Sequence, residues 1–258
     1  MVQIVTSKIF AKFPQIKHGY FTRKGGVSDR DYTSLNFGYN SGDLKENIEK
    51  NYQIAAKYLN IPVANIITLI QTHSDIIHVY KQNNIIKANA VAGDAVFTLE
   101  KNIAMSVLTA DCLPILIYAS DLDVISAIHA GWRGAFSGII NKFIEQILQQ
   151  GAKAKNIYIA LMPSICQASY EVDINFYNNF MWQNPKNIDC FKKTTNHKFL
   201  FNLRLYAKNI LQSYKITNID DINLDTYSNN NKCFSHRKFT HGNQLSTGRN
   251  LSFIIKTN

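Results

Sequence analysis

The sequence predicts a single α/β domain, because strand-like and helix-like segments alternate along the chain and neither a linker nor an internal repeat interrupts them. Apolar runs of strand length, rich in β-branched residues, supply the expected sheet. They cover residues 66–70, part of 90–99, 103–108, 114–118, 124–128 and 157–161. No stretch rich in Pro, Ser or Gly divides the chain, so we expect one compact domain over residues 1–258.

Three segments around these runs show the periodicity of an amphipathic helix. Residues 45–59 place apolar side chains on one face, and Pro62 ends the pattern soon afterwards. Residues 134–148 repeat the pattern, with Gly151 suited to the C-terminal cap. We expect a third helix over residues 203–214.

A formal net charge of +10 at pH 7 favours an anionic partner. Nucleic acid is not expected, because the lysines are scattered and neither an arginine-rich arm nor an aromatic RNA-binding motif is present. A small substrate that carries phosphate would exploit the same positive field. No apolar stretch approaches the roughly 18 residues that span a bilayer, so no membrane partner is expected either.

The cysteines indicate a reducing compartment. Cys112, Cys166, Cys190 and Cys233 are far apart and form no C-x-x-C pair, which argues against a disulfide framework. The N-terminal segment lacks the apolar stretch and the cleavage site of a secretory leader. We therefore expect a cytoplasmic protein.

Chemically capable residues follow three of the predicted strands. His73, Cys112 and His129 stand at or near three strand ends, where loops of an α/β sheet aim side chains into one crevice. Two imidazoles and a thiolate are the ligands of a catalytic zinc, and they leave the fourth position for a water whose pKa the ion lowers. Zinc is favoured over copper because no blue-copper methionine motif accompanies these residues.

Two other interpretations of the cysteines and histidines stay open at this stage. In a cysteine hydrolase, Cys112 would be the nucleophile and His129 its base, with Asp111 orienting or stabilising nearby. Cys233, His236 and His241 form a second possible ligand cluster, although it lacks a fourth ligand at finger-like spacing.

Two segments are suited to binding an anion. The start of the helix predicted after His129 would offer unpaired amides, helped by Arg133. Arg237, Lys238 and Arg249 lie in a polar segment that either closes over an anionic substrate or is simply solvated. The glycine-rich segment 22–28 lacks the Walker order and is not an ATPase loop.

Taken in order, several segments resemble one family, that of the laccase-like multicopper polyphenol oxidases, also called peptidoglycan editing factors or purine nucleoside phosphorylases. The matching segments are His18-Gly-Tyr-Phe-Thr-Arg23, Ser34-Leu-Asn-Phe-Gly38, Gln71-Thr-His73, Gly93-Asp-Ala95, Thr109-Ala-Asp-Cys-Leu-Pro114, His129-Ala-Gly-Trp-Arg-Gly134, Tyr170-Glu-Val172, Phe234-Ser-His-Arg237 and Thr247-Gly-Arg249. The sequence departs from the family pattern at Ser164-Ile-Cys166 and at Lys238, which loses the bidentate geometry of arginine.

The resemblance implies a layered α/β/β/α sandwich and a zinc ion on His73, Cys112 and His129. It implies a catalytic domain that takes a purine nucleoside and phosphate, with phosphorolysis of adenosine, inosine or methylthioadenosine and deamination of adenosine. Rival functions are a cysteine hydrolase that edits peptidoglycan precursors and a copper-dependent phenol oxidase, which would need more clustered histidines.

On this view, further residues receive roles as expectations. The residues expected to hold substrate are Arg23, Asn36, Arg133, Arg237 and Lys238. Asp111 and Glu171 are the candidates for carrying a proton.

Overall fold

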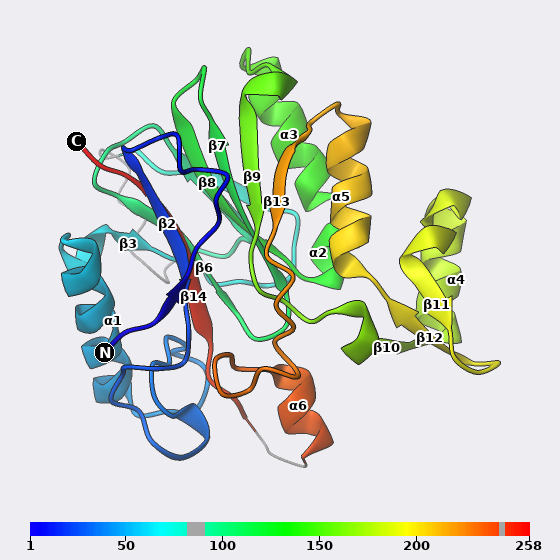
Figure 1. The fold of residues 1–258 in the computed structure, drawn as a ribbon, viewed down its shortest axis with the longest axis horizontal. Helices are drawn as coiled ribbons and strands as arrows, with labels where there is room; N and C mark the ends of the chain where they lie inside the picture. The colour runs from blue at the N-terminus through cyan, green and yellow to red at the C-terminus, as the bar shows by residue number, and fades with distance from the viewer. Residues whose placement is uncertain (82–90, 243–245) are drawn as a thin grey trace.

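The computed structural model describes residues 1–81, 91–242 and 246–258 (Figure 1). Two β-sheets face each other at its centre. The first has five strands in the order β1 (Ile4–Val5), β2 (Ile16–Phe21), β14 (Asn250–Lys256), β6 (Ala104–Thr109) and β3 (Ile66–Ile67). The second has six, in the order β13 (Asn218–Asp221), β9 (Ile157–Leu161), β7 (Leu113–Ala119), β8 (Val124–Ala130), β5 (Ala95–Thr98) and β4 (Ile77–Val79).

Helices cover the outer face of each sheet, and the layered α/β/β/α prediction is confirmed (Figure 1). Helix α1 (Lys45–Leu59) packs its apolar face on the five-stranded sheet. Helices α3 (Ile139–Gln149) and α5 (Leu203–Ser213) pack on the six-stranded sheet. A third apolar layer fills the space between the sheets.

Strand β7 illustrates how the sequence produces these layers. Side chains alternate across a strand, so Ile115 and Ile117 contact the helical layer, whereas Leu116 and Tyr118 contact the opposite sheet. Every residue of β7 is buried, because both faces of its sheet are covered. A strand of this kind reads as a continuous apolar run, which is why its position was evident in the sequence.

The predicted helix over residues 134–148 was wrong in its extent. It consists of two helices, α2 (Trp132–Phe136) and α3, which are separated at Gly138 by a left-handed backbone with φ of +92°. The apolar periodicity was read correctly, but a single glycine breaks the helical ladder. Gly151 follows α3 with a φ of +103° and donates its backbone N–H to the carbonyl of Leu148, as its predicted capping role requires.

The bounds of the remaining predicted elements are closer to those in the structure. Helix α1 has the predicted bounds, and α5 ends one residue early, at Ser213. The strand expected over 66–70 is only two residues long in β3, and an isolated bridge from Ile70 to Ala92 continues it. The segment predicted within 90–99 forms β5, although residue 90 lies outside the described residues.

Several elements had no sequence prediction. Polar residues interrupt β2 and β14, such as Lys17, His18 and Ser252, and they hid two neighbouring strands of the five-stranded sheet. A small sheet of β10 (Glu171–Asp173), β12 (Lys198–Phe201) and β11 (Phe191–Lys193) lies with helix α4 (Ile174–Gln183) at the right of Figure 1. The other short elements are α6 (His236–His241) and the 3-10 turns Arg30–Tyr32, Val63–Asn65, Ala154–Asn156, Gln167–Ser169 and Pro185–Cys190.

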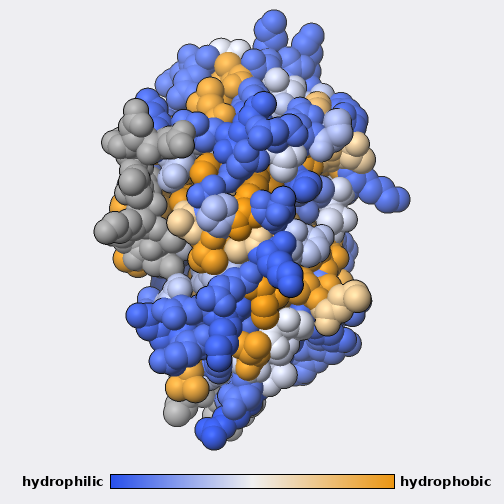
Figure 2. Space-filling model, turned by 90° about the vertical axis from the view of Figure 1, so that its left-hand side faces the viewer, coloured by the Kyte–Doolittle hydropathy of each residue, from blue (hydrophilic) through white to orange (hydrophobic). Residues whose placement is uncertain are grey.

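The surface on the side of α1 is mainly hydrophilic, with hydrophobic side chains in separate groups between polar ones (Figure 2). Scattered exposed apolar residues of this kind are ordinary on a water-facing surface. In the described ranges of the chain, no helix combines the length and the apolar character needed to cross a bilayer.

Candidate metal centre and adjoining cavity

The three residues predicted to bind metal converge. One ligand atom from each of His73, Cys112 and His129 lies within 4.8 Å of the others. The thiol Sγ of Cys112 is 3.7 Å from Nε2 of His73, and the two imidazole rings meet edge to face with centroids 4.9 Å apart. Donors from three distant parts of the chain thus surround one point.

Strand register explains this convergence. Cys112 directly precedes β7 and His129 is the penultimate residue of β8. These strands are antiparallel, with Pro114 paired to His129, so the start of one and the end of the other lie at the same edge of the sheet. His73 comes from the loop that follows the bridge at Ile70.

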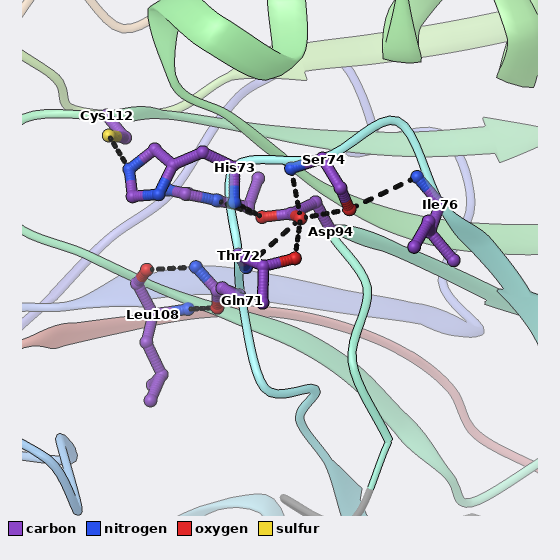
Figure 3. A network of polar contacts seen from close by, with 9 residues as sticks. Gln71, Thr72, His73, Ser74, Ile76, Asp94, Leu108 and Cys112 are labelled. Atoms are coloured by element: carbon purple, nitrogen blue, oxygen red, sulfur yellow. Dashed lines mark hydrogen bonds and ion pairs between the residues drawn. The ribbon is translucent and has the colours of Figure 1, made fainter.

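Asp94 holds two of the three ligands in place, and Figure 3 shows its contacts with the segment that carries His73. Its Oδ1 accepts hydrogen bonds from Nδ1 of His129 at 2.7 Å and from the backbone N–H of His73 at 3.0 Å. Its Oδ2 accepts from the backbone N–H and the hydroxyl of Ser74, at 2.7 and 2.6 Å. These bonds fix His73 in a left-handed conformation, with φ of +58°, and leave Nε2 of His129 as its ligand atom.

Without a bound metal, the charges of these groups favour a thiolate at Cys112 beside a protonated His129. Burial acts to raise the pKa of Asp94, but hydrogen bonds from His129 and Ser74 outweigh it and lower that pKa to about 2. Burial acts to raise the pKa of Cys112, yet His129 and His73 lower it to about 6. Burial acts to lower the pKa of His129, but the negative charge of Cys112 and the bond to Asp94 raise it to about 9. The thiolate, which is the metal-binding form of cysteine, is therefore stabilised.

Because Gly131 has no side chain, the space enclosed by the three ligand atoms stays open. A Cβ atom at this position would lie 2.6 Å from Cδ2 of His73 and 3.0 Å from Sγ of Cys112. Any side chain here would enter the volume between the donors. These groups fit a bound metal ion. They are a soft thiolate, two imidazoles, a carboxylate that supports the ligands and a glycine that leaves room for the ion.

The three ligands lie in the wall of a cavity of about 700 Å³, a size suited to a small-molecule ligand. The wall includes three cationic side chains, those of Arg133, Arg237 and Arg249. Other wall residues, neutral or apolar, are Tyr39, Asn40, Ser41, Leu69, Ile70, Gln71 and Leu108. The metal ligands are thus accessible to a ligand that also meets guanidinium groups.

Asp111 links the metal centre to Arg237. Its Oδ2 accepts a hydrogen bond from the backbone N–H of Arg237 and its Oδ1 accepts one from the hydroxyl of Thr226, both at 2.6 Å. Arg237 in turn donates from Nη1 to the carbonyl of Glu171 at 2.8 Å and lies over the ring of Tyr170. Asp111 lines the cavity, as expected of a functional residue, but both of its oxygens hold structural partners.

The structure places Arg23 and Asn36 outside the cavity wall. The guanidinium of Arg23 donates to the carbonyls of Thr33, Asn230 and Asp31 and lies 4.4 Å from the centroid of the Phe234 ring. Asn36 is fully buried, and its amide is bonded on both sides. Both side chains hold loops together, and their positions do not support direct substrate contact.

Glu171 and Lys238 do not reach the wall either. The exposed carboxylate of Glu171 pairs with Lys198 at 3.4 Å, so its backbone carbonyl, and not its side chain, supports Arg237. The ammonium group of Lys238 lies 5.0 Å from the centroid of the Tyr227 ring. Arg133, by contrast, does line the cavity, with its guanidinium beside the Trp132 ring.

The second possible ligand cluster does not form. Cys233 is buried between the sheets, His241 lies beside the hydroxyl of Tyr227, and His236 lines the cavity. Within the described residues, His73, Cys112 and His129 are the group that is arranged to hold a metal. The helix start expected to bind an anion belongs to α2, which has only five residues, and we assign it no anion site.

Sequence reasoning missed some functional positions. Asp94 was noted only within Gly93-Asp-Ala95, since nothing local marks a carboxylate as the partner of a distant histidine. Gln71 exchanges two hydrogen bonds of 2.7 Å with the backbone of Leu108 and so fixes the wall beside the metal ligands. Tyr170 and His236 also line the cavity.

The fold and the site define this molecule as an α/β/β/α protein whose described residues include one His–Cys–His cluster able to hold a metal ion. The family model described as multi-copper polyphenol oxidoreductase laccase matches residues 17–257. The chain therefore belongs to that family.

Relatives and solved structures agree with this assignment. A purine nucleoside phosphorylase of Rickettsia prowazekii is 31% identical over 239 residues, which are 91% of this chain and 94% of the relative. One of Haemophilus influenzae is 32% identical over 90% of this chain and 91% of its own. The hypothetical protein YfiH of Bacillus licheniformis superposes with a TM-score of 0.88 at 25% identity, over 95% of this chain and 94% of that structure.

Proposed function

We propose that this protein is a zinc-dependent purine nucleoside phosphorylase, and that the whole chain acts as one catalytic domain. The observation that carries the proposal is the His–Cys–His centre beside an arginine-rich wall in one cavity of about 700 Å³. The wall suits phosphate, and the rest of the cavity is large enough for a nucleoside. The names of the relatives support the same substrates.

Zinc suits these donors better than copper. Zinc is commonly bound by thiolate and imidazole together, which are the donors of Cys112, His73 and His129. Sγ of Cys112 and Nε2 of His73 are 3.7 Å apart, so both could hold one ion. A multi-copper oxidase needs several copper sites, whereas the described residues form one cluster. When bound, zinc supplies a Lewis acid that polarises a substrate oxygen or activates a water.

In phosphorolysis, a phosphate oxygen bonds to C1′ of the ribose as the bond from C1′ to the purine nitrogen breaks. The electron pair of that bond leaves with the base, which takes up the proton that the attacking hydrogen phosphate gives up. We assign to Arg133 and Arg237 the task of binding phosphate and balancing its charge. Asp111 acts by positioning, because it anchors the backbone of Arg237 and has no unengaged carboxylate oxygen.

Deamination of adenosine is a second candidate activity at the same site. The observation that favours it is that the cluster offers three ligands from the described residues, which would leave a place at a bound ion for a water. Phosphorolysis of methylthioadenosine would be compatible with a cavity of this size.

A single incubation tests these activities. Zinc-loaded protein is mixed with adenosine and inorganic phosphate, and the products are separated by chromatography. Adenine with ribose 1-phosphate indicates phosphorolysis, inosine indicates deamination, and unchanged adenosine contradicts both. Omission of phosphate is the matched control, since it stops phosphorolysis and leaves deamination unaffected. Inosine and methylthioadenosine replace adenosine in parallel reactions.

Metal removal separates this proposal from a cysteine hydrolase that acts on peptidoglycan precursors. Chelation is expected to abolish turnover, and zinc is expected to restore it. Turnover by a protein free of metal would instead favour Cys112 as a nucleophile activated by His129. All four cysteines are free, and we propose a cytoplasmic location, where thiols stay reduced.

A further inference from the structure

We propose that Arg249 is the anchor of the phosphate subsite and that the buried Asn36 is the positioning residue that holds it there. This inference rests on the proposed phosphorolysis, which requires phosphate in the cavity. It assigns Asn36 a role that acts through Arg249, since its own side chain does not line the cavity.

Asn36 ties two distant segments together. Its Oδ1 accepts a hydrogen bond from the backbone N–H of Arg249 at 2.8 Å and another from that of Gly38 at 2.9 Å. The carbonyl of Arg249 in turn accepts from the backbone N–H of Phe37 at 3.1 Å. Arg249 is therefore fixed on both sides of its Cα atom by a segment more than 200 residues earlier in the chain.

The other end of the Asn36 amide is anchored too. Its Nδ2 donates to Oγ of Ser41 at 2.8 Å and to Oδ2 of Asp43 at 2.9 Å. The amide is fully buried, so none of these bonds is exchanged with water. An amide that uses both donor and acceptor sides has one orientation, which makes the link to Arg249 rigid.

The side chain of Arg249 is directed by its surroundings. Its stem lies against Gly38, where an added Cβ would approach Cγ of Arg249 to 2.8 Å. Its Nη1 donates to the carbonyls of Thr247 and Gly248, at 2.7 and 3.0 Å. Within the described residues, Nε and Nη2 make no hydrogen bond, and this edge of the guanidinium is available for an oxyanion.

Arg249 lines the same cavity as His73, Cys112 and His129. Burial lowers the pKa of Arg249, and the negative charges of Cys112 and Asp111 act in the opposite direction. A half-buried guanidinium close to the metal ligands is well suited to hold an anion beside them. Arg133 is more exposed, and Arg237 already uses Nη1 on Glu171. Among the three arginines of the cavity wall, Arg249 therefore has the most firmly fixed position.

The test measures binding of inorganic phosphate to the zinc-loaded protein by calorimetry, separately from turnover. Asn36→Ala and Arg249→Ala are each expected to weaken phosphate binding roughly ten-fold or more, as loss of a charge-assisted contact does. In the double variant, Asn36→Ala should add little to Arg249→Ala, because both changes remove the same contact. Asn187→Ala, which breaks a buried amide bond to the carbonyl of Phe180 far from the cavity, is the control for general destabilisation.

Kinetics distinguish positioning from mere support of the fold. Asn36→Ala should raise KM for phosphate with kcat changed less than about two-fold, whereas a purely structural loss lowers the active fraction and leaves KM unchanged. If Asn36→Ala does not fold, the paired exchange Asn36→Asp with Asp43→Asn keeps an acceptor for Arg249 and conserves charge. Phosphate affinity near that of the unmodified protein is expected for this pair.

The possible results separate the two proposals. The positioning role is overturned if Asn36→Ala binds phosphate with normal affinity. It is also overturned if Asn36→Ala weakens phosphate binding as much in the Arg249→Ala background as in the unmodified protein. Phosphate binding that depends on both residues, in a protein that cleaves no nucleoside, contradicts the proposed function and leaves the subsite standing.

Discussion

The imidazole of His129 donates from Nδ1 to Oδ1 of Asp94 over 2.7 Å, and both side chains are buried. The same oxygen accepts from the backbone of His73. One carboxylate therefore orients two of the three metal ligands, although it was not predicted as a site residue. Support of this kind raises the basicity of a histidine ligand and fixes its tautomer.

Asp94→Asn is expected to lower zinc affinity roughly 10- to 100-fold, because the amide replaces one acceptor with a donor and weakens the orientation of both imidazoles. Competition with a chromophoric chelator measures the change. Asp75→Asn removes the carboxylate of a surface pair with Lys142 and should leave affinity unchanged. Equal affinities of Asp94→Asn and the unmodified protein would show that Asp94 does not support the metal.

Gly131→Ala is expected to reduce the bound zinc, because the new methyl group would meet Cδ2 of His73 at 2.6 Å and crowd Cys112. The backbone of Gly131 has an ordinary φ of −71°, so steric conflict at the ligands is the cause. Gly151→Ala is the opposite case. It has open space but a φ of +103°, and it should lower stability by about 1 kcal/mol while zinc content stays normal. Metal analysis and thermal unfolding of both variants decide the matter.

Arg23→Ala is expected to act on stability and not on substrate binding. Loss of its hydrogen bonds to backbone carbonyls, and of its contact with Phe234, should lower the free energy of unfolding by roughly 2 kcal/mol. Denaturant titration gives this value, and steady-state kinetics give KM. A large rise in KM for nucleoside or phosphate, at normal stability, would restore the role in substrate binding that the sequence predicted.

His18 is expected to make the protein sensitive to acid. Burial lowers the pKa of His18 from 6.5 to about 4, with the charge of Asp220 acting against this, and the neutral Nε2 accepts a hydrogen bond from the backbone of Ser7. The unfolded chain thus binds a proton near pH 6.5 that the folded chain binds only near pH 4. Stability is full above pH 6.5 and falls towards pH 4, by about 2 kcal/mol at pH 5.

His18→Gln removes this proton uptake, so the difference in unfolding free energy between pH 7 and pH 5 should shrink by that amount. Urea unfolding at the two pH values measures it. His197→Gln changes an exposed histidine and should leave the difference as it is. An unaltered pH dependence in His18→Gln would place the acid-sensitive group elsewhere.

Much of the fold was readable because the structure buries both faces of its central strands. β7, β8 and β9 are wholly buried and therefore appear as apolar runs, and α1 shows its buried stripe at helical spacing. β2 and β14 were missed because their polar residues find partners only in the folded chain. Lys256, for example, is buried and donates to the carbonyls of Leu99 and Asp123.

The sequence by itself determined which residues can bind a metal, since imidazole and thiolate chemistry belongs to the residue types of His73, Cys112 and His129. Local apolar patterns also determined the α/β class, whereas the layered arrangement was implied by the family resemblance. Only the tertiary structure decided that Asp94 supports the ligands, that Arg249 reaches the cavity and that Arg23 does not. Contacts between segments far apart in the chain depend on strand register and packing, and no local pattern records them.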